Sequence, residues 1–261
     1  DLSPSIEIPP IPADVGPENI SDEERTWLRA EIAKLKKERN ALILAHNYMP
    51  ADVQDVADVT GDSLHLAKVG SESDADVLLE AAVLFRNQIL AAKKKPHQIV
   101  LMPDPKALCS LAAHADVEKI RAWKAEHPKG IVIMYVNTYI EVKAEADFCC
   151  ASANAPQVAE YVMKNYPDYD ILFGPDVYLG LYNSKILLGM GLSIDRLWLQ
   201  MGACHVHEQI RPGHLQEQQR LNPDAVSVGH MECGCQSACL LPMVNGSENK
   251  SKGIISIGMF V

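Results

Sequence analysis

Three cysteines, a histidine and a glutamate fall within ten residues near the end of this chain, in the stretch HMECGCQSAC at 230–239. Thiolates and imidazoles bind transition metals, two thiols can form a redox pair, and a carboxylate beside an imidazole suits proton transfer. The cluster offers four soft ligands to zinc in the pattern His-x2-Cys-x-Cys-x3-Cys, but this spacing differs from the common Cys-x2-Cys pairs. A local metal site, a redox group and part of an active site with its metal elsewhere all remain open, and the rest of the chain must decide.

Other residues with catalytic or ligand chemistry directly follow short apolar runs. In chain order they are His46, Asn47 and Tyr48, then Cys109, then Tyr135, Asn137 and Thr138, then Cys204 and His207, and finally His230 and Glu232. In parallel α/β sheets, ligands bind beyond the carboxyl ends of the strands. Because such residues recur at this one position, we predict an active site built from strand ends.

The elements that must position these residues are apolar runs rich in Val, Ile and Leu. We expect strands within 41–46, 76–85, 98–104, 130–137, 148–154, 170–176, 196–202, 225–230 and 253–258. Amphipathic stretches separate them, and a helix that begins after Ser21, with Glu24 completing a capping box, precedes the first run. Continuous apolar strands between helices indicate parallel βαβ units with both faces of the sheet covered.

Nine strands are too many for one short sheet in a chain of this size, so we predict several sub-domains. The expected architecture is α/β, with three pseudo-symmetric three-layer αβα sub-domains whose short parallel sheets surround a central site. Their expected ranges are 20–97, 98–195 and 196–261, the last incomplete, after a flexible, Pro-rich and acidic arm at 1–19. An echo between IVLMPDPKAL at 99–108 and ILFGPDVYLG at 171–180 supports a repeated unit.

Composition narrows the class of protein. A hydrophobic content of 48% is typical of a globular chain, and a net charge of −10 argues against a nucleic-acid binder. No apolar run approaches the ~18 residues that a membrane span needs, and the first residues lack the cationic region of a secretory signal. Seven cysteines without an export signal favour a reducing cytoplasm, where cysteine clusters serve metals or catalysis.

Five segments resemble the successive motifs of the quinolinate synthase family. They are LAHNYMPADVQDVADVTGDSLHLAK, LMPDPKALCSLA, YVNTYIEVKAEADFCCASANA, GACHVHEQI and GHMECGC, in the family's order and at compatible spacing. The resemblance implies three αβα domains around a 4Fe–4S cluster, which three cysteines hold while the fourth iron acts as a Lewis acid. It implies condensation of iminoaspartate with dihydroxyacetone phosphate to quinolinate in the biosynthesis of NAD, with L-aspartate oxidase as a possible supplier of iminoaspartate.

The same resemblance assigns roles to individual residues. Cys109 and Cys204 match two cluster ligands, His46 and Tyr48 match a pair used in proton transfer and positioning, and Glu232 matches the general base. The expected substrate contacts are Ser63, Tyr135, Asn137, Ser152, His207 and His230. Ser63 also stands where a turn enters a helix, so backbone N–H groups and its hydroxyl can receive an anion. By this reading Cys233, Cys235 and Cys239 are bystanders or a redox-sensitive group.

The sequence also departs from the family pattern. The third cluster cysteine is absent from these 261 residues, which favours a fragment, although Cys235 or Cys239 as a substitute ligand, or an unusual cluster, stays open. Arg86 lies in LFRNQ where a Met/Gly-Glu-Thr stretch is usual, Tyr139 replaces a small residue, and Ile257 replaces a hydroxyl. Two rival functions therefore remain: a non-catalytic metal-binding relative with a decayed centre, and a zinc-dependent α/β lyase or hydrolase.

Overall fold

The structure is a computed structural model that describes residues 20–226, 228–229 and 255–256. The chain divides into two compact units, residues 1–108 and 109–261. Among the described residues, no helix is both long enough and apolar enough to cross a membrane.

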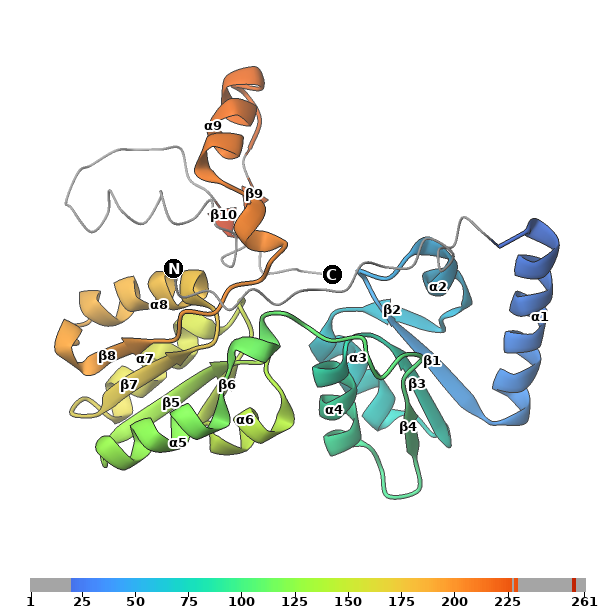
Figure 1. Cartoon of the computed structure of the whole chain (residues 1–261), viewed down its shortest axis with the longest axis horizontal. Coiled ribbons are helices and arrows are strands. Elements are labelled where there is room, and N and C mark those ends of the chain that lie inside the picture. Colours follow the sequence, from blue (N-terminus) through green and yellow to red (C-terminus); the bar gives the residue numbers. More distant parts are fainter. Residues whose placement is uncertain (1–19, 227, 230–254, 257–261) are drawn as a thin grey trace. The chain divides into compact units, whose positions relative to one another are not determined.

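The two units contain a regular alternation of helices and strands (Figure 1). The first unit consists of α1 (Asp22–Glu38), β1 (Ala41–His46), α2 (Ala51–Val56), β2 (Val59–Gly61), α3 (Ser63–Glu72), β3 (Val77–Ala81), α4 (Leu84–Lys93) and β4 (Ile99–Leu101). The second unit contains η2 (Ala112–His114), α5 (Val117–Glu126), β5 (Gly130–Tyr135), α6 (Ile140–Glu145), β6 (Phe148–Cys150), α7 (Ala155–Asn165), β7 (Asp170–Gly174), α8 (Val177–Gly189), η3 (Ile194–Arg196), β8 (Leu197–Leu199), η4 (His207–Gln209), α9 (Pro212–Leu221), β9 (Val228–Gly229) and β10 (Ile255–Ser256).

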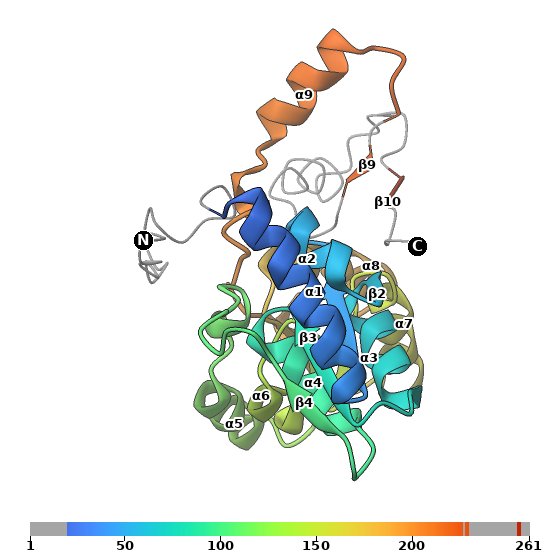
Figure 2. The ribbon, with the colours of Figure 1, turned by 90° about the vertical axis from the view of Figure 1, so that its right-hand side faces the viewer.

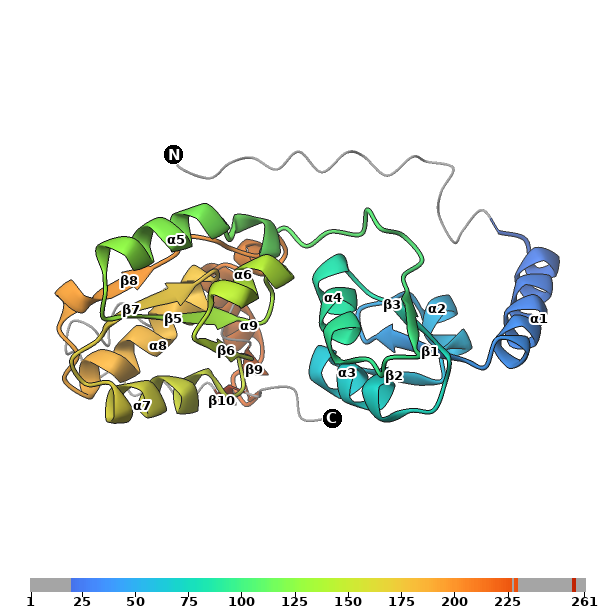
Figure 3. The same ribbon diagram turned by 90° about the horizontal axis from the view of Figure 1, so that it is seen from below.

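The first unit is built on a parallel four-stranded sheet with the order β2-β1-β3-β4. Helices α3 and α4 cover one face, where Leu66 and Leu90 pack on Leu44 and Leu78 of the sheet. Helix α1 lies on the opposite face against β1, as Figures 1 and 3 show, and it is in the foreground in Figure 2. The result is a three-layer αβα unit.

The second unit repeats this plan with the parallel order β6-β5-β7-β8. Alternate residues of β5 face opposite ways: Ile133 joins a core with α7 and α8, whereas Val132 joins a core with α5 and α6. Figure 3 shows α5 and α6 on one side of this sheet and α7 and α8 on the other. Both faces are therefore covered, as the continuous apolar strands predicted.

The two sheets share a detail that goes beyond strand order. In the first unit, Asp58 accepts a hydrogen bond from the backbone N–H of Ile43 at 2.9 Å and pairs with Lys36. In the second unit, Asp147 accepts from the N–H of Val132 at 2.8 Å and lies 3.5 Å from Lys124. In each unit an aspartate at the equivalent position accepts a hydrogen bond from the equivalent strand amide. Together with the shared strand order, this shows that β1–β4 and β5–β8 are structural repeats.

The α/β class and the parallel sheets predicted from sequence are confirmed, and each of the nine predicted runs contains a strand. Strand β2 was missed, because its three residues lie inside a stretch that reads as amphipathic helix. The echo between 99–108 and 171–180 was misleading: it matches β4 with β7, whereas the shared strand order makes β7 the equivalent of β3. The first unit ends at Leu108, whereas the sequence placed its end at residue 97. The three-fold division stays a prediction, and the arm at 1–19 lies outside the described residues.

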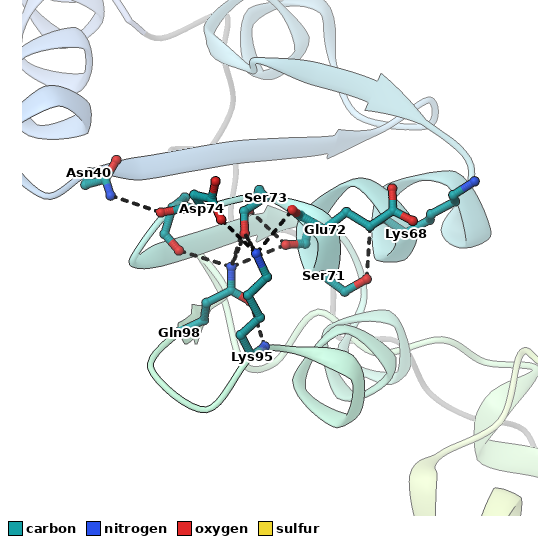
Figure 4. A network of polar contacts seen from close by, with 10 residues as sticks. Asn40, Lys68, Ser71, Glu72, Ser73, Asp74, Lys95 and Gln98 are labelled. Atoms are coloured by element: carbon teal, nitrogen blue, oxygen red, sulfur yellow. Dashed lines mark hydrogen bonds and ion pairs between the residues drawn. The ribbon is translucent and has the colours of Figure 1, made fainter.

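The amino-terminal edge of the first sheet is held by a saturated polar network (Figure 4). The amide Nε2 of Gln98, a residue only 1% exposed, donates to the carbonyl oxygens of Ser73 and Ala75 at 3.1 Å each. Lys95 donates to the carbonyl of Ser73 at 2.7 Å and to the carboxylate of Asp74 at 2.8 Å. This edge is therefore closed by structural hydrogen bonds, and the opposite edge of the sheet carries the predicted site residues.

Candidate functional site

His46 is the last residue of β1 and is 2% exposed. The register pairs it with Gly61 at the end of β2, so the exits of these two strands are neighbours. The loop that follows is fixed by Gln54, whose amide donates to the carbonyl oxygens of Asn47 at 3.2 Å and Met49 at 2.7 Å. The turn that follows His46 is therefore held in place by hydrogen bonds.

His46 and Tyr48, predicted to act as a pair, are in contact. Their ring centroids lie 4.4 Å apart, and the backbone N–H of Tyr48 donates to Nδ1 of His46 at 3.2 Å. An acceptor at Nδ1 places the ring proton on Nε2. Nε2 is buried without a hydrogen-bond partner in the described structure, so it presents an N–H that a substrate oxygen would satisfy.

Burial and, to a smaller extent, the positive charge of Arg86 lower the pKa of His46 to about 3, against the opposing influence of Asp62. The imidazole is therefore neutral at pH 7. The resemblance implied a residue that takes part in proton transfer. The structure instead gives a neutral hydrogen-bond donor, because the ring lies in the protein interior.

Ser63 is the first residue of α3, as expected for a turn that enters a helix. The cap, however, is Asp62, whose carboxylate accepts from the N–H groups of Leu64 and His65 at 2.9 Å each. These amides are occupied by a carboxylate, so the anion site predicted at the helix start is left with the Ser63 hydroxyl, which is half-buried.

Three further buried polar residues lie on β3 and α4, and none of them was predicted to have a role. Glu80 on β3 is 1% exposed, and Arg86 and Asn87 in the first turn of α4 are 8% and 5% exposed. Burial raises the pKa of Glu80 to about 7, although the charge of Arg86 opposes this. Glu80 pairs in register with Leu44, and side chains two residues apart share a face, so Glu80 lies on the same face of the sheet as His46. The signal was present in sequence, since a glutamate inside an apolar run calls for a partner.

In the second unit, Tyr135 is the last residue of β5, Asn137 follows that strand, and Ser152 follows β6. These strands are neighbours, because Tyr135 pairs with Cys150. Tyr135 is 7% exposed and packs in the main core of the unit, whereas Asn137 and Ser152 are half-buried in loops. The predicted substrate contacts of this unit therefore share one edge of the sheet.

Cys109 is half-buried and packs against the core that contains Tyr135. Tyr139, the residue that departs from the family pattern, lies at Cys109: burial and the nearby thiolate raise its pKa, whereas a hydrogen bond from the Cys109 backbone lowers it. Burial also lowers the pKa of Lys143 on α6 to about 8, against the raising influence of Cys149, Glu141 and Cys109. Lys143 donates to the carbonyl of Thr138 and places a cation near the Cys109 thiol. This lysine was not recognisable from sequence, because a charged residue on a short helix is expected to be solvent-exposed.

Cys204 is also half-buried and packs against the same core. Burial raises the pKa of its thiol, but hydrogen bonds from the His207 side chain and from the backbone N–H groups of His207 and Val206 outweigh this and hold it below the usual value. A thiol that is readily deprotonated is suited to bind a metal, because the thiolate is the ligand. His207, predicted as a substrate contact, is thus in direct contact with a predicted ligand.

The segments that carry Cys109 and Cys204 are joined, although 95 residues separate them. The hydroxyl of Ser110 lies 2.6 Å from Nδ1 of His205, and the backbone N–H of His205 donates to the same oxygen at 3.4 Å. A second contact brings His114 against Gly202, where an added Cβ would lie 2.8 Å from the Cβ of His114. The two predicted ligands therefore belong to adjoining segments, as a shared centre requires.

Several predicted residues lie outside the described part of the chain. They are His230, Glu232, Cys235 and Cys239. Within residues 20–226, no group of three or more His, Cys, Asp or Glu side chains is arranged to hold a metal ion.

The fold and site define an α/β protein with two parallel sheets. The first unit buries polar side chains at the end of β1, and the second brings two thiol-bearing segments into contact. Residues 30–249 match the family described as NadA, quinolinate synthetase A protein. The chain therefore belongs to the quinolinate synthetase A family, a family of enzymes.

Similarity to individual relatives extends over most of the chain. It is 43% identical to the quinolinate synthase of Pyrobaculum aerophilum over 83% of this chain and 67% of that protein. It is 42% identical to the enzyme of the same name from Thermus thermophilus, over 87% of this chain and 70% of that protein. For Mycobacterium tuberculosis the identity is 41%, over 84% of this chain and 60% of the relative. The relatives are longer than the chain.

Proposed function

We propose that this chain carries the condensing site of a quinolinate synthase, which joins iminoaspartate to dihydroxyacetone phosphate in the biosynthesis of NAD. The observation that supports this best is the contact between the segments that carry Cys109 and Cys204, whose thiols both pack against the core of one parallel sheet. The reaction is inferred from membership of the family, and the described residues have the chemistry that this reaction needs.

Cys109 and Cys204 would provide two of the three thiolate ligands by which the family holds a 4Fe–4S cluster. Three features of the described residues fit this group: both thiols lie against one core, their segments are in contact, and the pKa of Cys204 is lowered. When bound, such a cluster supplies an open iron as a Lewis acid for substrate oxygens.

The remaining roles belong to side chains of the protein. His46, neutral and with its proton on Nε2, donates a hydrogen bond to a carbonyl oxygen of the substrate and so favours enolisation at the adjacent carbon. Tyr48 keeps that ring in place through its backbone N–H. Ser63 contacts the phosphate through its hydroxyl.

In the second unit, Tyr135, Asn137 and Ser152 bind the carboxylates of the other substrate, and His207 contacts substrate next to Cys204. His230 binds substrate and Glu232 removes protons as the general base, both by resemblance, since they lie outside the described residues. We further propose that the protein works in the cytoplasm and that L-aspartate oxidase supplies its unstable imine.

Anaerobic reconstitution with iron and sulfide tests the proposal. The full chain should gain broad absorbance in the blue part of the visible spectrum, and Cys109→Ser with Cys204→Ser should abolish it. The matched control is Cys149→Ser, which removes an exposed thiol of the same unit and should leave the absorbance unchanged. Retention of the signal in the double variant would refute the ligand assignment.

Product formation and metal content separate the rival functions. Quinolinate formed from both substrates by the loaded protein supports the synthase. A fully loaded cluster without product would favour the non-catalytic relative, and stoichiometric zinc without iron, in protein purified without air, would favour the zinc enzyme.

A further inference from the structure

We propose that Ser110 and His205 form a clasp that sets the separation of the two cluster thiols before any metal binds, which makes His205 a positioning residue. The inference rests on the proposed function, because it concerns the ligands assigned there. The family motif Cys-x-Val-His leaves the position of His205 open, so the clasp belongs to this chain's own sequence.

The geometry of the clasp is two-pronged. With Nδ1 of His205 unprotonated, the hydroxyl of Ser110 donates to it at 2.6 Å, and the same oxygen accepts from the backbone N–H of His205 at 3.4 Å. Ser110 directly follows Cys109 and His205 directly follows Cys204. Any separation of the two ligands therefore stretches both bonds.

The clasp is anchored on both sides. On one side, Nδ1 of His114 lies 2.8 Å from the carbonyl oxygen of Ser110, within the turn that follows Cys109. On the other side, Gly202 is held by backbone bonds to Pro175 and Val177, at 2.9 and 2.8 Å, which extend the sheet toward Cys204. An alanine at Gly202 would place its Cβ 2.6 Å from the carbonyl oxygen of Pro175, so only glycine allows this close approach.

The physical consequence is a smaller ordering cost when the ligands bind. A site that is formed before the metal arrives does not lose the conformational entropy of two independent loops at that moment. The clasp should therefore slow the release of iron, because one thiolate that dissociates stays close to the others.

The test is a double-mutant cycle on the full chain. His205→Leu and Ser110→Ala each remove the clasp, and His205→Asn keeps an acceptor at the position of Nδ1. His97→Leu, an exposed histidine of the first unit, is the matched control. In the reconstituted protein, the rate at which an iron chelator bleaches the visible absorbance should rise about 3- to 10-fold for either loss variant, as expected for one or two hydrogen bonds. The double variant should be no faster than the singles, and His205→Asn and His97→Leu should match the wild type. Unchanged rates in both loss variants, or effects that multiply in the double variant, would overturn the clasp.

A second measurement on protein without iron keeps this inference separate from the proposed function. Hydrogen exchange of the amides at 110–114 and 203–207 should accelerate together in Ser110→Ala and in His205→Leu, with recovery in His205→Asn. If the wild type takes up no cluster, the proposed function fails while this exchange result still decides the clasp. If both segments exchange at wild-type rates in the loss variants, the clasp is absent whatever the metal content.

Discussion

The two units share a scaffold and differ at the edge where chemistry is expected. Both place four parallel strands in the same order, and both bind a strand amide with an aspartate that pairs with a lysine. At the carboxyl edge, the first unit buries His46, Glu80 and Arg86, whereas the second presents Cys109 and Cys204. The repeated features are those that hold the sheet together, so the features that differ are where function is to be sought.

The amino-terminal edges support this distinction. In the first unit Gln98 and Lys95 bind the carbonyls before β3, and in the second Arg196 binds the carbonyl oxygens of Pro167 and Tyr169 before β7. Different residues thus satisfy the same backbone groups. By contrast, Nε2 of His46 and Oε2 of Glu80 are buried without partners in the described structure. In the first unit, polar atoms at the carboxyl-terminal edge of the sheet lack hydrogen-bond partners, whereas the carbonyls at the amino-terminal edge have them. This difference indicates that ligands bind at the carboxyl-terminal edge.

The largest effect should come from His46→Asn. Asparagine keeps an acceptor for the N–H of Tyr48 but removes the Nε2–H, so turnover to quinolinate should fall by about 10²- to 10⁴-fold. Steady-state kinetics of the loaded protein would measure this. Tyr135 ends β5, the strand of the second unit that is equivalent to β1. The variant Tyr135→Phe should mainly raise KM, because it removes a proposed substrate contact. Turnover of His46→Asn near that of the wild type would remove His46 from the reaction.

A second large effect concerns the pH dependence of stability in the first unit. The folded carboxyl of Glu80 keeps its proton up to about pH 7, whereas in the unfolded chain it releases the proton from its ordinary pKa of 4.5. Ionisation therefore favours the unfolded chain, and about 3 kcal/mol of stability is lost as the pH rises from 4.5 to 7.

Glu80→Gln removes this loss. The stability of the variant relative to the wild type should be independent of pH below about 4.5 and should gain about 3 kcal/mol by pH 8. Hydrogen exchange of the amides in β1 and β3, corrected for intrinsic rates, would report the free energy of unfolding. The positive charge of Arg86 lowers the pKa of Glu80, so Arg86→Met should push that pKa still higher. If the difference in stability between Glu80→Gln and the wild type stays constant from pH 4 to pH 8, the pKa of Glu80 is not raised by burial.

The amino-terminal edge offers the contrasting case, in Gln98→Leu. This change leaves the carbonyls of Ser73 and Ala75 buried without a donor, which should lower the free energy of unfolding by about 2–3 kcal/mol at every pH. Arg196→Met should weaken the second unit by less, because Arg196 is only partly buried. Chemical denaturation monitored by amide hydrogen exchange in each unit would measure the effects of the two variants separately. Reduced turnover in a folded Gln98→Leu protein would contradict the inference that the amino-terminal edge has only a structural role.

Much of this arrangement could be predicted from sequence, and the reasons for the misses are physical. The exit of β1 was recognisable, because an apolar run ends at His46, and helix α1 begins at the predicted cap, with Ser21 accepting from the N–H of Glu24 at 3.1 Å. Cys109 and Cys204 instead lie in the loops that follow β4 (Ile99–Leu101) and β8 (Leu197–Leu199). Strand β2 was not recognisable, because three residues are too short to show a period. The protonation state of His46 and the contact between Ser110 and His205 depend on tertiary packing, which no local pattern encodes.

The smallest and most discriminating prediction compares the two equivalent aspartates. Asp58→Asn and Asp147→Asn both keep an acceptor for the strand amide and remove only the ion pair with lysine. The pair is closer in the first unit, 2.7 Å between Lys36 and Asp58, than in the second, 3.5 Å between Lys124 and Asp147, and all four side chains are about a third exposed. We therefore expect Asp58→Asn to cost about 0.5–1 kcal/mol and Asp147→Asn about half as much, with both effects screened by salt. Exchange of the amides of Ile43 and Val132 would measure each unit at its own aspartate. Since the two sites are repeats of one design, a larger cost in the second unit would mean that its carboxylate does more than hold the strand, and the comparison of the two scaffolds would have to begin there.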